Sequence, residues 1–159
     1  MTSIEPLDPL RQQAWHTFVS LSTRLSAAID THLARECKLT HFEFRVLSTL
    51  AARDKHRLQL SALASAVDAS LSRLSHVVTT LERRQLVRRT AGNRHRNAIL
   101  TSHGHQAVLV AMPVYIDAVR ALALDALTDT QIEQWLTLTR AVLSHNSYAT
   151  AAREQQPTT

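Results

Sequence analysis

The sequence contains little of what builds tight turns, disulfide frameworks or aromatic-rich sites. It has two glycines, four prolines, one cysteine and seven aromatic residues among 159 positions. A single cysteine, Cys37, excludes an intrachain disulfide, which fits a reducing compartment. Few glycines and prolines favour a mainly helical chain with few tight turns. At this length we expect residues 1–159 to form one domain with one core.

Long apolar runs and a secretion signal are also missing. No uninterrupted apolar stretch approaches the roughly 20 residues that span a membrane. The N-terminus, MTSIEPLDPL, lacks the basic start and the apolar segment of a signal peptide. These absences predict a cytoplasmic protein with no membrane partner.

Motifs of catalysis, cofactor binding and metal binding are absent as well. There is no glycine-rich phosphate loop, no Gly-x-Ser-x-Gly elbow and no dense pair of carboxylates. Nine histidines invite a metal-site interpretation, but His103 and His105 would lie about 200° apart on a helix. We therefore expect no enzyme activity, no cofactor and no metal site.

What the sequence does have is positive charge gathered in one place. Between Arg73 and Arg96 there are seven arginines and one acid, Glu82, a net charge of 7 − 1 = +6, against +5 for the whole chain. The other residues therefore sum to about −1. Arginine suits bidentate contacts with phosphate and guanine. Such clustering is typical of a protein that reads double-stranded DNA.

The charged segment coincides with the pattern of a helix-turn-helix followed by a hairpin. We expect a strand over 57–59, a short helix over 61–67, a turn at 68–70 and a longer helix over 71–85. Two strands, 86–90 and 96–100, joined by 91–95, would then form a two-stranded β wing.

Longer helices flank this segment. A stripe of apolar residues spaced by three and four predicts one long helix from Pro9 to about Glu36. Thr40 and Glu43 form a capping box that opens a second helix, and Thr128 and Gln131 form another. The remaining predictions are a helix from Thr101 to about Leu124, kinked at Pro113, a last helix to about Tyr148, and a disordered tail over 149–159.

The helix over 71–85 separates into two faces. Leu71, Leu74, Val78, Leu81 and Gln85 share one face, which we expect to pack on the core. The opposite face and its ends carry polar and basic residues suited to the major groove. We expect Arg73 to read a guanine, and the predicted DNA contacts of this segment are Ser70, Ser72, Arg73, His76, Thr79, Arg83 and Arg84.

The wing supplies further candidates. Arg94, His95 and Arg96 lie at its tip, where they would reach the minor groove or its phosphates. Arg88 and Arg89 are predicted to be backbone clamps or salt-bridge partners.

These residues resemble the MarR (multiple-antibiotic-resistance regulator) family of winged-helix transcription factors over about residues 10–148. The segments that carry the resemblance are Ser72–Val78, Leu81–Arg84, Leu86–Arg89, and Asn97–Thr101 with Gly104. The sequence departs from the family at Gln85, where a glycine is usual, and at Gly92-Asn93-Arg94, which stands for the wing motif Asp-x-Arg in a shorter wing.

The resemblance implies a homodimer that represses genes from a pseudo-palindromic site and releases DNA when a small ligand binds. Residues 9–36 and 105–148 would form a helical dimerisation platform, and residues 40–100 the DNA-binding lobe. Trp15, Phe18, Phe42 and Phe44 are candidates to line a ligand pocket. A redox role for Cys37 is a weaker hypothesis, because the tyrosine partners typical of such sensors are missing. The alternatives are a winged-helix protein-interaction module and an architectural DNA-binding protein without a preferred site.

Overall fold

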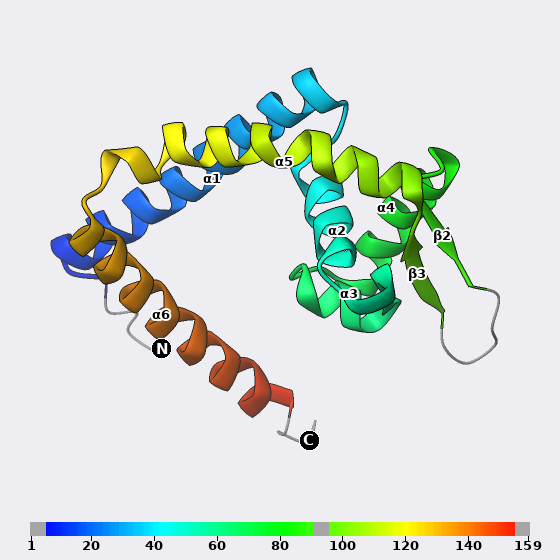
Figure 1. Cartoon of the computed structure of the whole chain (residues 1–159). Helices are drawn as coiled ribbons and strands as arrows, with labels where there is room; N and C mark the ends of the chain where they lie inside the picture. Colours follow the sequence, from blue (N-terminus) through cyan, green and yellow to red (C-terminus); the bar gives the residue numbers. More distant parts are fainter. Residues whose placement is uncertain (1–5, 91–95, 155–159) are drawn as a thin grey trace. The chain divides into compact units, whose positions relative to one another are not determined.

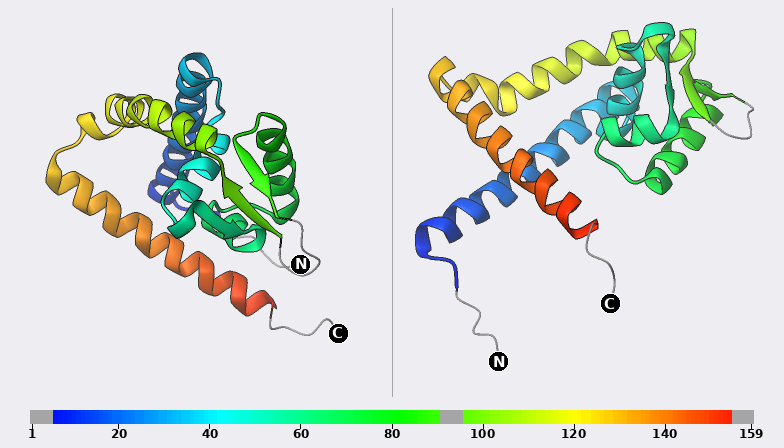
Figure 2. Two further views of the ribbon diagram at one scale, coloured as in Figure 1. Left: turned by 45° about the vertical axis from the view of Figure 1, so that its right-hand side comes forward. Right: turned by 90° about the horizontal axis from the view of Figure 1, so that it is seen from below.

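The structure, a computed structural model, describes residues 6–90 and 96–154, with side chains as far as residue 146. The chain divides into two compact units, Met1–Val119 and Arg120–Thr159. Figures 1 and 2 show the elements of each unit. The two units are described separately below.

The first unit holds all the strands of the described chain and most of its helices. Its fold is mainly α with a small antiparallel sheet, as the sequence predicts, and each predicted element is present. In chain order these are α1 (Pro9–Cys37), α2 (His41–Ala51), a 3₁₀ turn η1 (Asp54–His56), β1 (Arg57–Gln59), α3 (Leu60–Ala66), α4 (Leu71–Arg83), β2 (Val87–Arg89), β3 (Asn97–Leu100) and most of α5 (Ser102–Leu122).

The second unit contains the 3₁₀ turn η2 (Leu124–Ala126) and α6 (Asp129–Glu154). The predicted capping box is present, since the Thr128 amide donates to Gln131 Oε1 (2.9 Å) and the Gln131 amide donates to Thr128 Oγ (3.3 Å). α6 runs six residues beyond the predicted end at Tyr148, so the first part of the predicted tail is helical. Residues 155–159 lie outside the described residues.

Capping groups explain where the first two helices begin. Pro9 occupies the first turn of α1, and the Asp8 carboxylate accepts from the Arg11 amide at 3.0 Å. The Thr40–Glu43 capping box is complete, because each side chain accepts from the other residue's amide. Local sequence signals therefore fix these two boundaries.

The sheet has the strand order β1-β3-β2, with both pairings antiparallel. Arg57 pairs with Ile99 across β1 and β3, and Val87 pairs with Leu100 across β2 and β3. The predicted two-stranded wing is thus joined by β1 as a third strand. This pairing ties the wing to the start of α3, where the Leu60 amide donates to the Arg96 carbonyl at 2.9 Å.

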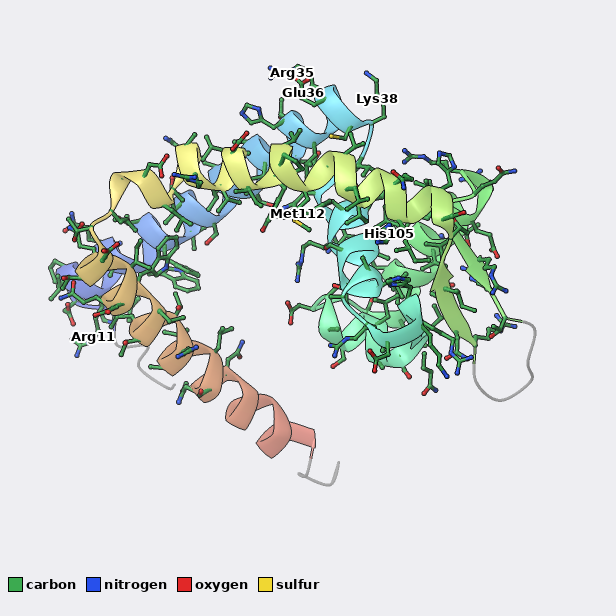
Figure 3. All side chains as sticks on the ribbon, in the orientation of Figure 1. Arg11, Arg35, Glu36, Lys38, His105 and Met112 are labelled. Carbon is green, nitrogen blue, oxygen red and sulfur yellow. The ribbon has the colours of Figure 1, made fainter. Side chains whose placement is uncertain are left out.

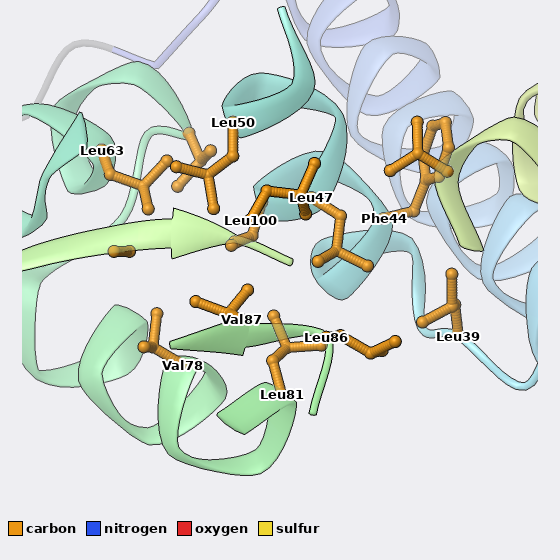
Figure 4. Packing of buried hydrophobic residues seen from close by; sticks show 14 of the residues in the cluster. Leu39, Phe44, Leu47, Leu50, Leu63, Val78, Leu81, Leu86, Val87 and Leu100 are labelled. Carbon is orange, nitrogen blue, oxygen red and sulfur yellow. The ribbon is translucent and has the colours of Figure 1, made fainter. Parts of the chain in front are cut away.

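The core lies where α2, α3, α4 and the sheet meet (Figure 4). Leucine and valine side chains that are less than 2% exposed fill it, as expected for a close-packed interior. Only Ile29 and Leu33 are buried in α1. The largest fully buried side chains are those of Leu33, Leu39, Val46, Leu47, Leu50, Leu63, Val67, Leu74, Val78, Leu81 and Val87.

The N-terminal half of α1 leaves its apolar side chains exposed. Leu10 is 76% exposed, Trp15 56% and Phe18 49%. In the second unit, Leu138, Val142 and Leu143 of α6 are each about two-thirds exposed, and none of the described side chains from Arg120 onward is buried. Large exposed apolar faces of this kind mark interaction surfaces.

Within the described residues, the stretch Ser102–Ala126 is long and apolar enough to cross a membrane by length and composition, because it contains an 18-residue window with a mean hydropathy of 1.8. Isolated polar residues interrupt the apolar run, but the mean hydropathy of this window stays high. One such helix is weak evidence for a span, and α5 buries Val108, Ala111 and Ala118 within this protein. Pro113 lies inside α5, which continues past it to Leu122.

α4 ends in a left-handed turn at Gln85, whose φ is 59°. The Leu86 amide donates to the Leu81 carbonyl and the Gln85 amide to the Glu82 carbonyl, both at 2.9 Å. These two bonds define a Schellman motif, whose left-handed position is usually glycine. The helix therefore stops at Arg83 rather than at the predicted Gln85, with a residue that carries a Cβ in the left-handed position.

The start of α5 packs directly on this turn. The Thr101 amide (3.1 Å) and the Thr101 hydroxyl (3.1 Å) lie within donating distance of the Leu86 carbonyl, and the hydroxyl also contacts the Gln85 carbonyl (2.7 Å). The Gly104 amide donates to the same hydroxyl at 2.9 Å. A Cβ on Gly104 would lie 2.0 Å from the Leu86 carbonyl oxygen. This position therefore has no room for a side chain.

Replacing Gln85 with glycine should stabilise the protein. Glycine removes the left-handed strain of about 1–2 kcal/mol, partly offset by about 0.4–1 kcal/mol of extra freedom in the unfolded chain. We expect Gln85→Gly to raise the free energy of unfolding by about 0.5–1 kcal/mol, measured by urea denaturation. Gln85→Ala is the control, because it keeps the Cβ. Equal stability of the two variants would contradict the assignment.

Replacing Gly104 with alanine should have the opposite effect. The methyl group must displace either the Leu86 carbonyl or the start of α5, which costs about 2–3 kcal/mol. Thermal unfolding of Gly104→Ala, compared with Ser102→Ala in the same turn of α5, measures the effect. A melting temperature for Gly104→Ala close to that of the control would show that the contact yields easily.

Candidate nucleic-acid interface

α4 presents one polar face and one buried face, as its sequence predicts. Ser70 begins the helix, and its hydroxyl accepts from the Arg73 amide at 3.2 Å. Leu74, Val78 and Leu81 are fully buried. The predicted DNA-facing residues of α4 that are exposed are Ser72, Arg73, His76, Thr79 and Arg83.

Leu71 departs from the prediction. It is 53% exposed instead of packed on the core, because it belongs to the first turn of α4, before the first core residue, Leu74. With polar neighbours it surrounds a shallow surface depression on the exposed face of the helix. The lining residues are Leu71, Ser72, Ser75, His76 and Thr79. Three of the predicted DNA contacts therefore share one surface.

The turn between α3 and α4 is linked by a side-chain contact to a third helix, α2. Asp68 adopts a left-handed conformation with φ 52°, and its carboxylate is 2.9 Å from the Arg45 guanidinium of α2. The Ala69 amide donates to the Ala64 carbonyl at 3.0 Å. These contacts fix the angle at which α4 leaves α3, which is what a helix-turn-helix requires.

Arg73 is held by an aromatic ring rather than by an ion pair. Its guanidinium carbon lies 4.2 Å from the centroid of the Phe42 ring. Arg83, on the same face, donates to Thr80 Oγ at 3.3 Å. Both arginines are exposed and retain donors for an anionic partner.

Arg84, predicted to approach the DNA backbone, has other partners. Its Nη1 is 3.3 Å from both carboxylate oxygens of Glu43, and its Nη2 donates to the Lys38 carbonyl at 2.8 Å. Glu43 is 7% exposed and also completes the α2 capping box. These contacts join the end of α4 to the start of α2, so we assign Arg84 a structural role.

Arg89 is a salt-bridge partner, as predicted. Its Nη1 lies 3.5 Å from Glu82, and its Nη2 donates to the Ser75 carbonyl (2.8 Å) and to Thr79 Oγ (2.9 Å). The Arg89 Nε is buried with no partner among the described residues. The Thr79 hydroxyl, in turn, donates to the Ser75 carbonyl at 2.9 Å. β2 is thereby fastened to the middle of α4.

The structure describes only part of the predicted wing. Arg96 is exposed next to β3, and Arg88 is exposed on β2. Arg94 and His95 lie outside the described residues. Because Arg84 and Arg89 are paired with glutamates, the exposed positive charge of α4 and of the described part of the wing is carried by Arg73, Arg83, Arg88 and Arg96, and Arg53, Lys55 and Arg57 add exposed charge ahead of α3.

The four aromatic residues proposed for a ligand pocket are not gathered into one site. Trp15 and Phe18 pair with each other on exposed α1, with ring centroids 6.0 Å apart. Phe44 is buried against Tyr115, with centroids 4.8 Å apart. Phe42 instead lies under Arg73. Helical spacing alone therefore grouped side chains with three different environments.

Metal and redox chemistry find little support in the described residues. Within residues 6–90 and 96–154, no three His, Cys, Asp or Glu side chains lie close enough together to hold a metal ion. Burial raises the pKa of the Cys37 thiol, with a smaller contribution from Glu36. A raised pKa disfavours the reactive thiolate, which argues against a redox role.

Sequence reasoning missed Phe42, Glu43, Glu82 and Thr101 as residues that organise this surface. The capping box identified Glu43, but its second partner, Arg84, is 41 residues away. A pattern read along one helix cannot reveal such a contact. Only the spacing of Glu82 and Arg89, seven residues apart across a turn, offered a local signal.

The helix-turn-helix, the antiparallel wing and the exposed basic face of α4 together define a winged helix-turn-helix DNA-binding protein. Comparison with known proteins narrows the class. The sequence profile of the MarR family matches residues 39–96. Together with the 30% identity to the MarR family regulator described next, over 91% of this chain, this match shows that the chain belongs to the MarR family of transcriptional regulators.

Similar solved structures come from several bacteria. The chain is 30% identical to Sco3205 of Streptomyces coelicolor, a MarR family transcriptional regulator solved in complex with DNA, with a TM-score of 0.86 and coverage of 91% of this chain and 92% of that chain. AbsC of the same organism is 27% identical, with a TM-score of 0.85 and coverage of 91% and 99%.

A more distant likeness is to BpsR of Bordetella bronchiseptica, whose DNA binding is regulated by 6-hydroxynicotinic acid. It is 19% identical, with a TM-score of 0.75 and coverage of 87% of this chain and 99% of that chain. At this identity the likeness is one of fold. No curated protein sequence matches the chain.

The link between Arg89 and α4 predicts a loss of stability when it is removed. Arg89→Ala deletes one ion pair and two charge-assisted hydrogen bonds, which should lower the free energy of unfolding by about 1–2 kcal/mol. Arg88→Ala, the exposed neighbour, is the matched control and should change it by less than about 0.5 kcal/mol. Urea denaturation of both variants measures the difference, and similar values would contradict the proposed fastening.

Proposed function

We propose that this regulator binds one specific double-stranded DNA site as a homodimer and represses transcription from it. The observation that carries the proposal is the exposed face near the N-terminus of α4, where Ser72 and His76 line an open depression and Arg73, next to Ser72 in the sequence, is exposed. The N-terminal part of a recognition helix is the part that contacts base edges. Its relative Sco3205 was solved in complex with DNA.

The proposed roles of the side chains follow from the hydrogen-bonding groups that they can offer to DNA. Arg73 offers its donors to the two acceptors of a guanine. Ser72 and His76 contact bases or phosphates, and Arg83 contacts the backbone at the far end of α4. The Ser70 hydroxyl already accepts from an amide and keeps its own hydrogen for a phosphate. Arg94, His95 and Arg96 complete the interface as the proposed minor-groove contacts of the wing.

The homodimer is supported by apolar surface that either unit alone leaves uncovered. Trp15, Phe18 and Val19 of α1 and Leu138 and Val142 of α6 are between 42% and 66% exposed. A second copy of the chain would cover such faces, and two-fold symmetry then predicts a pseudo-palindromic site. The dimerisation region proposed from the sequence, residues 9–36 and 105–148, contains these residues.

We further propose that a small ligand releases the protein from DNA, by analogy with BpsR, whose DNA binding is regulated by 6-hydroxynicotinic acid. Trp15 and Phe18, paired and exposed on α1, are the aromatic residues available to such a ligand. Phe42 contacts Arg73 and Phe44 packs on Tyr115, and both stay proposed as pocket residues. As a regulator that acts on DNA, the protein is expected in the cytoplasm, without enzyme activity.

The experiment is a binding titration with a labelled duplex from the region upstream of the gene. We expect an affinity on the order of 10⁻⁸ to 10⁻¹¹ M at physiological salt, clearly tighter than for a scrambled duplex. Arg73→Ala should weaken binding to the preferred duplex by roughly 5- to 150-fold. Affinity should also fall steeply as salt rises, because phosphate contacts release counterions.

Arg35→Ala is the matched control for this titration. Arg35 lies beside Glu36 at the C-terminal end of α1 (Figure 3) and is 65% exposed, so its replacement removes the same charge outside the proposed interface. It should bind like the wild type. Equal weak binding to both duplexes would favour the architectural alternative, and no binding at low salt would overturn the proposal.

A further inference from the structure

We propose that Phe42 of α2 is a positioning residue for base recognition, because it holds the guanidinium of Arg73 at the base-reading end of α4. This inference rests on the proposed function and adds a residue outside the helix-turn-helix to it. The consequence is that base specificity is shared between α4, which carries the reading side chain, and α2, which orients that side chain.

The geometry is that of a cation–π contact. The guanidinium carbon of Arg73 lies 4.2 Å from the Phe42 ring centroid, well inside the roughly 6 Å over which a cation and an aromatic face attract. Phe42 is half-buried and packs against the core, whereas Arg73 is exposed. The ring is therefore the firm partner and the arginine the mobile one.

The position of the Phe42 ring is fixed by the residues on either side of it. The Thr40–Glu43 capping box sets the first turn of α2, and the guanidinium of Arg84 lies 3.3 Å from the Glu43 carboxylate. Since Arg84 follows directly after α4, the same contacts hold the Phe42 ring and α4 in a fixed relation.

The contact with Phe42 does not use up the donors of Arg73. The ring attracts the positive charge of the guanidinium, whose N–H groups are the donors that bind guanine. Among the described residues, the Arg73 guanidinium makes no hydrogen bond or ion pair, whereas those of Arg83, Arg84 and Arg89 all do. The Arg73 side chain is thus restrained while its donors stay available. It therefore loses less conformational entropy on binding DNA than an unrestrained arginine would.

The opposite interpretation is that Phe42 is a latch that keeps Arg73 away from DNA. The two interpretations differ in the sign of the effect. If the Phe42 ring positions Arg73 for DNA, its removal weakens specific DNA binding. If the ring is a latch, its removal strengthens DNA binding. Arg73 is exposed while it contacts Phe42, which favours the positioning role.

The test is selection from a pool of duplexes with a random central segment, followed by affinity measurements on the duplex that the wild type prefers. For Phe42→Leu we expect roughly three- to thirtyfold weaker binding and loss of preference at one base pair in each half-site, the same pair that Arg73→Ala loses. Phe42→Tyr keeps an aromatic face and should restore both affinity and preference.

A double variant separates positioning from general support of the fold. Phe42→Leu combined with Arg73→Ala should bind no more weakly than Arg73→Ala alone, because the ring acts only through that arginine. Phe44→Leu is the matched control in the same helix. It should lower stability but leave the base preferences unchanged, since Phe44 contacts Tyr115 and not Arg73.

Each outcome is decisive. An unchanged profile and affinity for Phe42→Leu, tighter binding, or additive losses in the double variant would overturn the inference while leaving the proposed function intact. A wild-type protein that selects no sequence would instead overturn the proposed function. Thermal unfolding checks that each variant is folded, and if Phe42→Leu is not, Phe42→Met, which is closer in volume, takes its place.

Discussion

The close approach of α5 to the carbonyl of Leu86 sets the geometry of the DNA-binding lobe. At that carbonyl the Schellman turn ends α4, β2 is about to begin and Thr101 starts α5. The missing side chain of Gly104 is what allows the three elements to meet. Because the sheet, the recognition helix and α5 share this point, none of them can shift without moving the others.

A second constraint divides the arginines of the lobe into two groups. Arg84 and Arg89 are paired with glutamates and hold α4 to α2 and to β2. Arg73 and Arg83 stay exposed on the face that the others orient. Only part of the positive charge that identifies the segment in the sequence is therefore left without an acidic partner among the described residues. The rest supports the scaffold through partly buried ion pairs. The desolvation cost of such a pair is lower when each charge also makes hydrogen bonds.

Most of the fold could be predicted from the sequence, and the reasons are local. Capping boxes at Thr40 and Thr128 mark helix starts, and apolar spacing marks the buried faces of α2 and α4. The prediction failed where a choice depended on distant neighbours. Leu71 follows the apolar period of α4 but lies beyond the core. Gln85 continues the helical pattern of α4, yet the chain turns there. Leu86 is buried, and its amide completes the turn by donating to the Leu81 carbonyl.

The sequence by itself determined the order of the elements, the concentration of charge and the family resemblance, because each is a property of neighbouring residues. The tertiary structure alone decided what each side chain does. Phe42 shares its helical spacing with core residues but meets Arg73, 31 positions later, and Arg84 meets Glu43, 41 positions earlier. Such pairings form only when α2 and α4 pack on the same core, so no pattern within either helix contains them.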